Sequence, residues 1–531
     1  MKDLKSDAVV KVRMGEFFAP SAFPNAKAHF GRVFRGQPNV YDTPFAKGES
    51  TEHMLREWNK TLISIKDKWP SLYQFETDMQ SKVGPLSVMK PLKDRIQDIQ
   101  QYYEGILLPS NPIDPSAIKA VISEFNVVRG IGIRTTSETI KFMKKSSNSG
   151  TPYFTKRRNV LESGANLRIL QHSTTTDGYT NAAILGWRGQ EGGYSKDDVK
   201  QRVVWMFPFS VNVQELRVYQ PLIEMAQRHE IVPAWVSMEC VDHYITKLFD
   251  TKAPEDLVVC TDFTKFDQHF NQHLVETAAD VLRSVFNSTI NGWLEDVFPI
   301  KYNIPMLISN SQLVKGRHGM GSGSGGTNAD ETLAHRALQY EAARKIGSRL
   351  NPNSQCLGDD GILSYPGITV EDVVRCYSAH GLEMNTSKQY ASTQDCVYLR
   401  RWHHEKYRIN HVCAGVYSTM RALGRLRYLE RYMDPRVWGP KAVALRQLSI
   451  LENVKYHPLR EQFAEFCMKR DKYRLGIDIP GFLTNIEDEV KRVVDYMPDF
   501  MGYVKTLQNS ETDGFGIRKW WIYQYLMNYN A

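Results

Sequence analysis

Residues 354–365, with the sequence SQCLGDDGILSY, constrain the fold of this chain more than any other stretch. Two short apolar runs flank a turn that contains two glycines and two adjacent acids. Glycine and aspartate tolerate the tight backbone of a two-strand hairpin, so the pattern predicts a β-hairpin with two carboxylates at its tip. An ordinary surface turn is the alternative, since a Gly-Asp-Asp triplet arises by chance in roughly one chain in ten of this length. The turn residues are Gly358, Asp359, Asp360 and Gly361.

A second acidic stretch follows the apolar run Leu-Val-Val-Cys at 257–260, which is typical of a strand buried on both faces. Asp262 lies where this strand emerges. If the strand pairs with the hairpin, Asp262, Asp359 and Asp360 meet at one edge of a sheet. Carboxylates this close repel one another unless cations neutralise them, and hard oxygen ligands suit Mg²⁺, with Mn²⁺ as a substitute. We therefore expect two divalent ions about 4 Å apart, the usual arrangement for in-line attack of a sugar hydroxyl on a phosphate.

Between the two acidic stretches, residues 319–328 form the glycine-rich run GMGSGSGGTN, and a helical pattern follows directly. Glycine lets the backbone approach a ligand closely, and a helix N-terminus favours phosphate. A flexible linker is the alternative, but this run leads straight into a helix and is not an extended low-complexity tract. No Gly-Lys-Ser/Thr follows, which excludes a P-loop. The run indicates a ligand-binding loop at the start of a helix.

In this order and spacing, the three stretches resemble motifs A, B and C of viral RNA-dependent RNA polymerases. The resemblance is strongest to those of double-stranded RNA viruses of the picobirnavirus and partitivirus type. The family often has Asn four residues after the motif B Thr, where this chain has Glu331, and Asn328 is the alternative sugar contact. The matching residues are Asp262 and Asp267 for motif A, Ser322, Gly323 and Thr327 for motif B, and Gly358, Asp359 and Asp360 for motif C.

Four further matches extend the resemblance over residues 149–401. SGTP at 149–152 is similar to the template-entry motif G, and KQRVVW at 200–205 is similar to the basic motif F. Downstream, Gly-Leu at 381–382 with Lys388 is similar to motif D, and YLRR at 398–401 is similar to the primer-grip motif E. The resemblance implies a mixed α+β right-hand fold, in which a palm with an antiparallel sheet flanked by helices lies between fingers and a helical thumb.

The N-terminal residues 13–50 combine prolines with aromatics, which is typical of an extended irregular arm that packs on the body of a protein. The resemblance implies that this arm bridges the fingers and the thumb. The expected division is an arm at 1–50, fingers at 51–239, palm at 240–270, a return to the fingers at 271–314, palm at 315–407, and thumb with C-terminal tail at 408–531.

The resemblance implies template-directed RNA synthesis from ribonucleoside triphosphates by two-metal nucleotidyl transfer, which replicates and transcribes a viral RNA genome. Asp262, Asp359 and Asp360 are the expected metal-binding catalytic acids. Lys388 is the expected general acid for the leaving pyrophosphate. Asp267 is expected to accept a hydrogen bond from a group that contacts the ribose 2′-hydroxyl. The expected nucleotide contacts are Lys200, Arg202, Asp267, Ser322, Gly323, Thr327 and Asn328.

Two other functions stay open on the residues alone. A reverse transcriptase shares the palm and its metal-binding acids, although Asp267 and the loop at Ser322 favour ribonucleotide use. A non-catalytic RNA-binding scaffold is disfavoured because all three metal-binding acids are present. Comparing ribonucleotide with deoxyribonucleotide incorporation, and binding with turnover, separates these classes.

Positive charge gathers in three places that flank the motifs, at 144–158, 400–408 and 421–431, although the net charge is only +8. Such clusters suit a channel that follows the phosphate backbone of RNA. Each cluster alone also fits a solvated surface. The expected contacts to template and product RNA are Ser149, Gly150, Lys156, Arg157, Arg400, Arg401, Arg421 and Arg425.

Seven cysteines are scattered without close pairs, which predicts reduced thiols and neither a zinc site nor a disulfide framework. No apolar run approaches the roughly 20 residues that span a bilayer, and no signal-peptide core is evident. We expect a soluble protein that is not secreted and has no membrane partner. The resemblance implies a place in the virion interior and the host cytoplasm, with viral capsid protein as a candidate partner.

Overall fold

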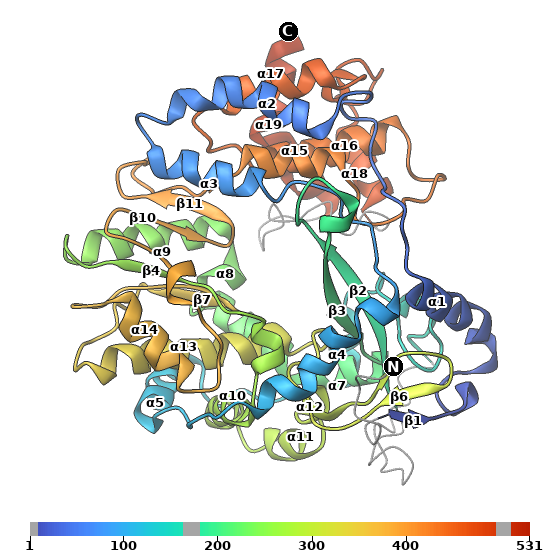
Figure 1. The fold of residues 1–531 in the computed structure, drawn as a ribbon, viewed down its shortest axis with the longest axis vertical. Coiled ribbons are helices and arrows are strands. Elements are labelled where there is room, and N and C mark those ends of the chain that lie inside the picture. Colours follow the sequence, from blue (N-terminus) through green and yellow to red (C-terminus); the bar gives the residue numbers. More distant parts are fainter. Residues whose placement is uncertain (1–8, 163–180, 495–510, 531) are drawn as a thin grey trace.

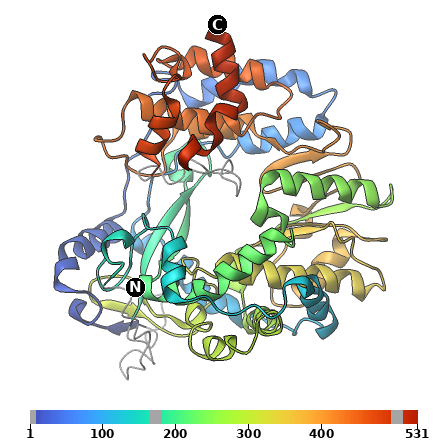
Figure 2. The same cartoon turned by 180° about the vertical axis from the view of Figure 1, so that it is seen from behind.

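The computed structural model describes residues 9–162, 181–494 and 511–530. The ribbon follows a ring-like course, with mixed sheets and helices on the left of Figure 1, a second sheet on the right and a body of helices at the top. Seen from behind, the same three parts surround the centre of the molecule (Figure 2). This mixed architecture agrees with the predicted α+β class.

The sheet that carries the predicted acids has the order β7-β8-β4-β9, and every neighbouring pair is antiparallel. All four residues of the central strand β4 are buried, as the continuous apolar run predicted. Helices α13 and α14 cover this part of the fold, and α13 packs directly on β7. The strands are β4 (Val258–Thr261), β7 (Gln355–Leu357), β8 (Asp360–Leu363) and β9 (Tyr390–Ser392), and the helices are α13 (Thr327–Lys345) and α14 (Val370–Ser378).

A small three-stranded antiparallel sheet lies beside the acidic sheet, because β10 contacts both β4 and β8. Its strands are β10 (Asp395–Tyr398), β11 (Arg401–His404) and β12 (Val416–Tyr417). Helices α8 (Pro233–Val236) and α9 (Met238–Thr251) lie on the same side of the molecule in Figure 1. Buried residues of α9, β4, β8 and β10 form one apolar cluster, which joins the two sheets into a single unit.

The second large sheet has the order β1-β6-β5-β2-β3, in which only the pair β2–β5 is parallel among the described strands. Its long hairpin, β2 and β3, extends toward the upper helical body (Figure 1). The pairing brings residues 306–314 back to residues 183–206. The strands are β1 (Val9–Lys11), β2 (Ala183–Gln190), β3 (Lys200–Met206), β5 (Met306–Leu307) and β6 (Gln312–Val314).

Seven further α-helices, and one of several short 3₁₀ turns, belong to the lower part of the described chain. Helix α5 shows the sequence logic of a helix start, because Pro115 occupies its first position and Asp114 caps it by accepting from the backbone N–H of Ser116. Helices α5, α10 and α13 pack against one another. The helices are α4 (Ile96–Glu104), α5 (Pro115–Glu124), α6 (Thr136–Phe142), α7 (Phe209–Arg228), α10 (Gln272–Val285), α11 (Ile290–Asp296) and α12 (Ile300–Asn303), and the 3₁₀ turn is Arg157–Asn159.

The upper helical body corrects one predicted boundary. Residues 51–80 were expected with 81–239, yet α2 and α3 pack on C-terminal helices. The indole of Trp58 donates to Thr419 Oγ1 at 2.8 Å and its ring lies edge-on to Phe463. The reason is that the apolar face of α2 needs a partner, and the C-terminal helices supply one. The helices are α2 (Thr51–Leu62), α3 (Pro70–Gln80), α15 (Thr419–Arg427), α16 (Pro440–Glu452), α17 (Arg460–Arg470), α18 (Ile486–Val493) and α19 (Trp521–Asn530).

The N-terminal segment is more regular than predicted, because helix α1 (Phe23–Arg35) interrupts the expected irregular arm. Its predicted packing is confirmed for Phe17, Phe18 and Phe30, which are buried in one cluster, whereas Phe34 is 70% exposed. Residues 36–50 then cross to the helical body. The backbone of Gln37 pairs with Met89, and that of Thr43 bonds to Arg427. Residues 1–8 of the predicted arm and 495–510 of the predicted tail lie outside the described residues.

A buried acid joins α3 to the start of α15. Glu76 is fully buried and accepts hydrogen bonds from the backbone N–H of Thr419 at 2.8 Å and of Met420 at 3.3 Å. Burial outweighs these bonds and raises the pKa of Glu76 from 4.5 to about 7. Because the folded-state pKa lies above the unfolded one, the stability that Glu76 contributes at low pH is lost as the pH rises through about 7.

We therefore expect the stability of the wild type, relative to Glu76→Gln, to fall between pH 5 and pH 8 by about 2–3 kcal/mol. Gln cannot titrate, so the difference between the two curves isolates this group. Urea unfolding of both proteins at four pH values measures it. Parallel curves across this range would show that Glu76 titrates normally.

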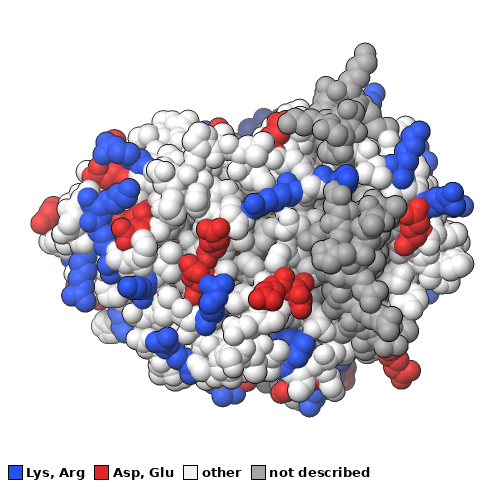
Figure 3. Space-filling model, turned by 90° about the horizontal axis from the view of Figure 1, so that it is seen from below, with Lys and Arg blue, Asp and Glu red and all other residues white. Residues whose placement is uncertain are grey.

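No helix among the described residues is both long and apolar enough to cross a membrane. On the face seen from below, Lys and Arg side chains are interspersed with Asp and Glu (Figure 3). All seven cysteines are buried, and none of them forms a disulfide.

Candidate active site

Strand pairing brings the two acidic stretches together, as the sequence predicted. Thr261 on β4 lies opposite Gly361 on β8, so Asp262 emerges beside the turn that carries Asp359. Leu357 pairs with Asp360, which leaves Gly358 and Asp359 as a two-residue turn. Gly358 has a φ of +58°, a conformation that glycine adopts without strain. Both Asp262 and Asp359 are exposed at the tips of their strands.

Side chains of α13 hold the hairpin from behind. The Thr332 hydroxyl accepts from the backbone N–H of Gly358 at 2.9 Å, and the His335 imidazole bonds to the Gly358 carbonyl at 2.9 Å. Both contacts end on the residue before Asp359. The position of that carboxylate therefore depends on the packing of α13 as well as on the turn itself.

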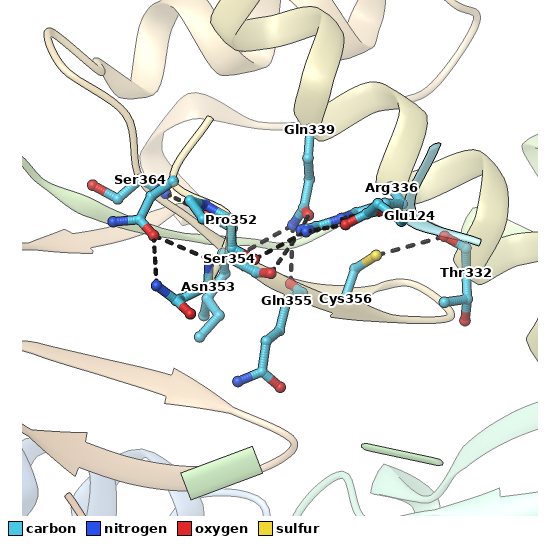
Figure 4. Close-up of polar contacts among 12 residues, drawn as sticks. Glu124, Thr332, Arg336, Gln339, Pro352, Asn353, Ser354, Gln355, Cys356 and Ser364 are labelled. Atoms are coloured by element: carbon cyan, nitrogen blue, oxygen red, sulfur yellow. Dashed lines mark hydrogen bonds and ion pairs between the residues drawn. The ribbon is translucent and has the colours of Figure 1, made fainter. Parts of the chain in front are cut away.

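Two polar residues of α13 extend this support along β7 (Figure 4). Arg336 donates to the backbone carbonyl of Ser354 at 2.6 Å and to the carboxylate of Glu124 at 2.8 Å. Gln339 donates to the backbone carbonyl of Gln355 at 2.9 Å. Charged and amide donors thus satisfy carbonyls on the edge strand, which has no strand neighbour on that side among the described residues.

The backbone of Asp262 is clamped by a residue that sequence reasoning missed. Gln389 accepts from the N–H of Asp262 at 2.7 Å and donates to its carbonyl at 2.9 Å. Three lysines lower the pKa of Asp262 electrostatically, with Lys388 the strongest, followed by Lys82 and Lys200. Lys82 was also missed, because nothing in its local sequence connects it with a strand end about 180 residues away.

The three predicted metal-binding acids all have pKa values above the ordinary range, and partial burial is the main cause for each. For Asp359, the carboxylates of Asp267 and Asp262 raise the pKa further. For Asp360 the pKa reaches about 7, and Asp359 adds to the effect. Clustered carboxylates that repel one another at neutral pH fit a site for divalent cations.

Asp360 differs from its neighbour, because its carboxylate points back into the protein. It accepts from the backbone N–H of Leu399 at 2.8 Å, in the turn between β10 and β11. Leu399 and Arg400 both have positive φ values, which a two-residue turn of this twist requires. Asp360 therefore ties the hairpin of the acids to the following hairpin.

Asp267 lies in the same cluster of charges and is buried. It accepts from Arg202 at 3.0 Å, and this ion pair places the predicted basic strand β3 beside the acids. Glu331 on α13 is also buried, and its pKa is raised well above 4.5 by burial and by a hydrogen bond with Asp267. Its Oε1 atom has no hydrogen-bond partner among the described residues.

The glycine-rich loop packs on β3, as its composition allows. A Cβ atom on Gly323 would lie 1.5 Å from the carbonyl oxygen of Trp205, so only glycine fits there. The hydroxyls of Ser322 and Thr327 donate to backbone carbonyls, those of Val203 and Gly321 respectively, both at 3.2 Å. These two hydroxyls therefore shape the loop.

Asn328 is exposed at the start of α13, and its amide orientation is set by a second residue that the sequence did not indicate. The indole N–H of Trp235 donates to Asn328 Oδ1 at 2.7 Å. Asn328 Nδ2 then faces Gly358. It lies 3.8 Å from the position that a Cβ atom on Gly358 would occupy. The amide donor consequently faces the turn of the acids.

Three of the predicted RNA contacts instead surround one acid. Arg421 and Arg425 of α15 lie 3.4 and 3.1 Å from the carboxylate of Glu191, and Arg400 lies 4.0 Å from it. Glu191 follows β2, so this cluster joins the long hairpin to the helical body. Arg421 is only 7% exposed, which corrects its predicted role as an RNA contact. Arg400 and Arg425 stay more accessible.

Three other predicted RNA contacts are corrected as well. Arg401 is 6% exposed, and its guanidinium makes two hydrogen bonds, of 2.7 and 3.0 Å, with the carboxylate of Asp242. Ser149 and Gly150 are buried in a turn, where Ser149 pairs through its backbone with Thr155. Burial explains these corrections, because a short sequence pattern does not reveal which charge or hydroxyl is used inside the fold.

Of the remaining predicted contacts, Lys156 is exposed and Arg157 is partly buried. Arg157 donates to Asn212 Oδ1 at 2.7 Å, which fixes its side chain against α7. Lys200, Arg202 and Lys388 are exposed near the acids, as described above. These residues form the accessible basic surroundings of the carboxylates.

Comparison with known proteins identifies the family. The model of the viral RNA-dependent RNA polymerase family matches residues 76–455. A potential RNA-dependent RNA polymerase of human picobirnavirus is 55% identical over 519 residues, which covers 95% of this chain and 96% of that protein. The RNA-directed RNA polymerase of Cryptosporidium parvum virus 1 is 23% identical over 278 residues, covering 50% of this chain and 52% of that protein.

Solved structures agree. The crystal structure of the RNA-dependent RNA polymerase of a human picobirnavirus matches with a TM-score of 0.91 and 53% identity over 99% of both chains. The crystal structure of its insertion loop deletion mutant matches with a TM-score of 0.90 and 52% identity, again over 99% of both chains. This chain therefore belongs to the viral RNA-dependent RNA polymerases, and it is an enzyme of a double-stranded RNA virus that synthesises RNA on a template.

Proposed function

We propose that Asp262 and Asp359 bind two Mg²⁺ ions, for which Mn²⁺ can substitute, and that Asp360 supports the pair from behind. The observation that carries the proposal is the meeting of Asp262 and Asp359 at one sheet edge. Partial desolvation raises the pKa of both carboxyls, and neighbouring carboxylates raise that of Asp359 further. The family depends on divalent metal ions in general. When bound, such ions activate the 3′-hydroxyl of the growing strand and bind the triphosphate.

The protein groups around the acids are suited to positioning the incoming ribonucleoside triphosphate. We assign the triphosphate contacts to Lys200 and Arg202, which are exposed on β3 beside the acids. Lys82 lies in the same electrostatic neighbourhood, since it interacts with Lys200 and Asp262. Lys388 interacts more strongly with Asp262 than either lysine does, which supports its assignment as general acid for pyrophosphate.

Selection of the ribose is assigned to a separate group of polar residues. Asp267, Glu331 and Asn328 lie near the turn of the acids, and they include a buried acceptor atom without a partner and an amide donor. Asn328 presents its Nδ2 donor there because Trp235 occupies its oxygen. Glu331, whose pKa is raised by burial, stands where the family often has Asn. Ser322 and Thr327 hold the loop.

We propose a division into subdomains, which the packing of the helices supports. We assign the palm to residues 240–270 and 315–407, and the fingers to residues 81–239 and 271–314. The thumb comprises 408–531 together with α2 and α3, because these helices share one apolar core. Residues 36–50 then form the connection between fingers and thumb. RNA binding is assigned to the accessible Lys156, Arg157, Arg400 and Arg425.

We also propose that the enzyme acts inside the virion and in the host cytoplasm, with capsid protein as a partner. The support is its family, since polymerases of double-stranded RNA viruses transcribe an enclosed genome. Copurification with the capsid protein of the same virus tests this part separately.

A template-extension assay tests the function. Primed and unprimed RNA are incubated with ribonucleotides or deoxyribonucleotides, in Mg²⁺ or in Mn²⁺. We expect ribonucleotide incorporation with either ion and none after chelation. Preferred use of deoxyribonucleotides would support a reverse transcriptase, and binding without turnover in both ions would support a scaffold.

A further inference from the structure

A Glu, a Cys and a His meet in the interior, away from the catalytic acids. Glu341 lies on α13, Cys376 on α14, and His380 two residues after α14, and all three are buried. One ligand atom of each lies within 4.8 Å of the other two. Glu341 is ten residues beyond Glu331 on the same helix, which corresponds to about 15 Å along the axis. The cluster is therefore separate from the active site.

Hydrogen bonds orient the three side chains toward one another. His380 Nδ1 lies 2.7 Å from the backbone carbonyl of Asn111 and so carries a proton, which turns Nε2 toward Glu341 Oε2. The other oxygen of Glu341 accepts from the backbone N–H of Asp114 at 2.9 Å. Cys376 Sγ lies 3.4 Å from Glu341 Oε2. A metal-binding His typically donates its second nitrogen to a carbonyl, and a metal-binding carboxylate is itself hydrogen-bonded.

We propose that Glu341, Cys376 and His380 bind a structural Zn²⁺ ion. Sulfur, imidazole nitrogen and carboxylate oxygen are the ligand types that zinc prefers, and three protein ligands with a water complete a tetrahedral site. Ligand atoms around tetrahedral zinc lie roughly 3.3–3.8 Å apart, and the Cys376–Glu341 separation of 3.4 Å falls in this range. When bound, the zinc ion would lie between His380 Nε2 and Glu341 Oε2, which face each other directly in this structure.

Charge balance is the same with and without the metal, so the buried site tolerates either state. A thiolate, a carboxylate and a neutral imidazole carry two negative charges, which Zn²⁺ neutralises. Without zinc, one proton lies between His380 Nε2 and the facing Glu341 oxygen, and the cysteine remains a thiol. Zinc binding therefore releases two protons, one from the Cys376 thiol and one from the His380–Glu341 pair.

The proposed site joins three segments that support the active site indirectly. It links α13, which also carries Thr332, His335 and Arg336, to α14 and to the segment at 111–114. Sequence spacing indicated no zinc site, because Glu341 comes from a different helix than Cys376 and His380. Only the packing of α13 on α14 brings the third ligand into place.

Zinc analysis of the full chain, purified without chelator and dialysed against zinc, tests the proposal. We expect about one zinc ion per chain in the wild type and little in Cys376→Ser or His380→Gln. Cys467→Ser is the matched control, because Cys467 is another fully buried thiol on α17. Asp359→Asn controls for zinc held by the catalytic acids. Both controls should retain the ion.

Replacing zinc with Co²⁺ tests the thiolate ligand in the wild-type protein itself, so this readout does not depend on whether a variant folds. We expect a thiolate-to-cobalt charge-transfer absorption in wild type and in both controls, and its loss in Cys376→Ser. Wild type without bound zinc and without this absorption would overturn the proposal, even if the site variants fail to fold. Equal zinc content in wild type and in folded Cys376→Ser would overturn it as well, because the metal would then lie elsewhere.

Discussion

RNA synthesis is expected to fall by at least about 10³-fold in Asp359→Asn, and by a similar factor in Asp262→Asn. Asn preserves the size of the side chain and removes the charge that holds a divalent ion. Metal-dependent stabilisation of the transition state amounts to several kcal/mol, and each 1.4 kcal/mol is a factor of ten in rate. Single-nucleotide extension on a primed template, with Mg²⁺ and then Mn²⁺ in excess, measures the loss.

The fold and template binding of these variants should stay intact, because both carboxylates are exposed and repel one another in the absence of cations. Asp280→Asn, on the exposed face of α10, makes the same change in charge away from the site and should leave activity unchanged. Normal incorporation by Asp359→Asn or Asp262→Asn would refute the metal assignment. Loss of template binding together with activity would point to misfolding.

Discrimination against deoxyribonucleotides is expected to fall about 10–100-fold in Asp267→Ala. This carboxylate bonds both to Arg202 and to Glu331, so its loss removes the group that orients the proposed ribose contacts. A single hydrogen bond to a charged group contributes about 1.5–3 kcal/mol. The ratio of kcat/KM for a ribonucleotide to that for the matching deoxyribonucleotide is the measurement.

Trp235→Phe should shift the same ratio in the same direction, by a smaller factor. Phe keeps the ring but cannot donate to Asn328, whose amide is then free to turn. Trp521→Phe, on α19 in the thumb, is the matched control. An unchanged ratio in Asp267→Ala would exclude its role in sugar selection. An unchanged ratio in Trp235→Phe alone would show that Asn328 does not contact the sugar.

The most predictive features of this sequence were short patterns that sterically allow few backbone conformations. The strand at 257–260 and the hairpin at 354–365 were both recognisable, because a continuous apolar run and a glycine-containing turn each have few alternatives. Their pairing was a condition of the predicted acidic site, and the structure shows that the two strands are neighbours. The glycine-rich loop was also recognisable. Its Ser322 and Thr327 hydroxyls, which were expected to contact the nucleotide, donate to backbone carbonyls in this structure.

Charged residues were predicted less well, and Arg401 shows why. A lone Arg in a basic stretch has the same sequence signature whether it faces RNA or a buried acid. Asp242 lies about 160 residues away, so nothing local shows that it occupies this guanidinium. Glu191 is likewise distant in sequence from the arginines around it. Its carboxylate lies within ion-pair distance of Arg400, Arg421 and Arg425, which come from two other parts of the chain.

The sequence by itself determined the family, the order of the motifs and the place of the acids at the strand ends, because these depend on residue type and on local backbone preference. Only the tertiary structure decided which side chains surround them. Gln389, Lys82 and Trp235 act across long separations along the chain, and a contact of this kind exists only after apolar faces have packed. That packing also joined α2 and α3 to the C-terminal helices, since an amphipathic helix specifies that it needs a partner but does not specify which one.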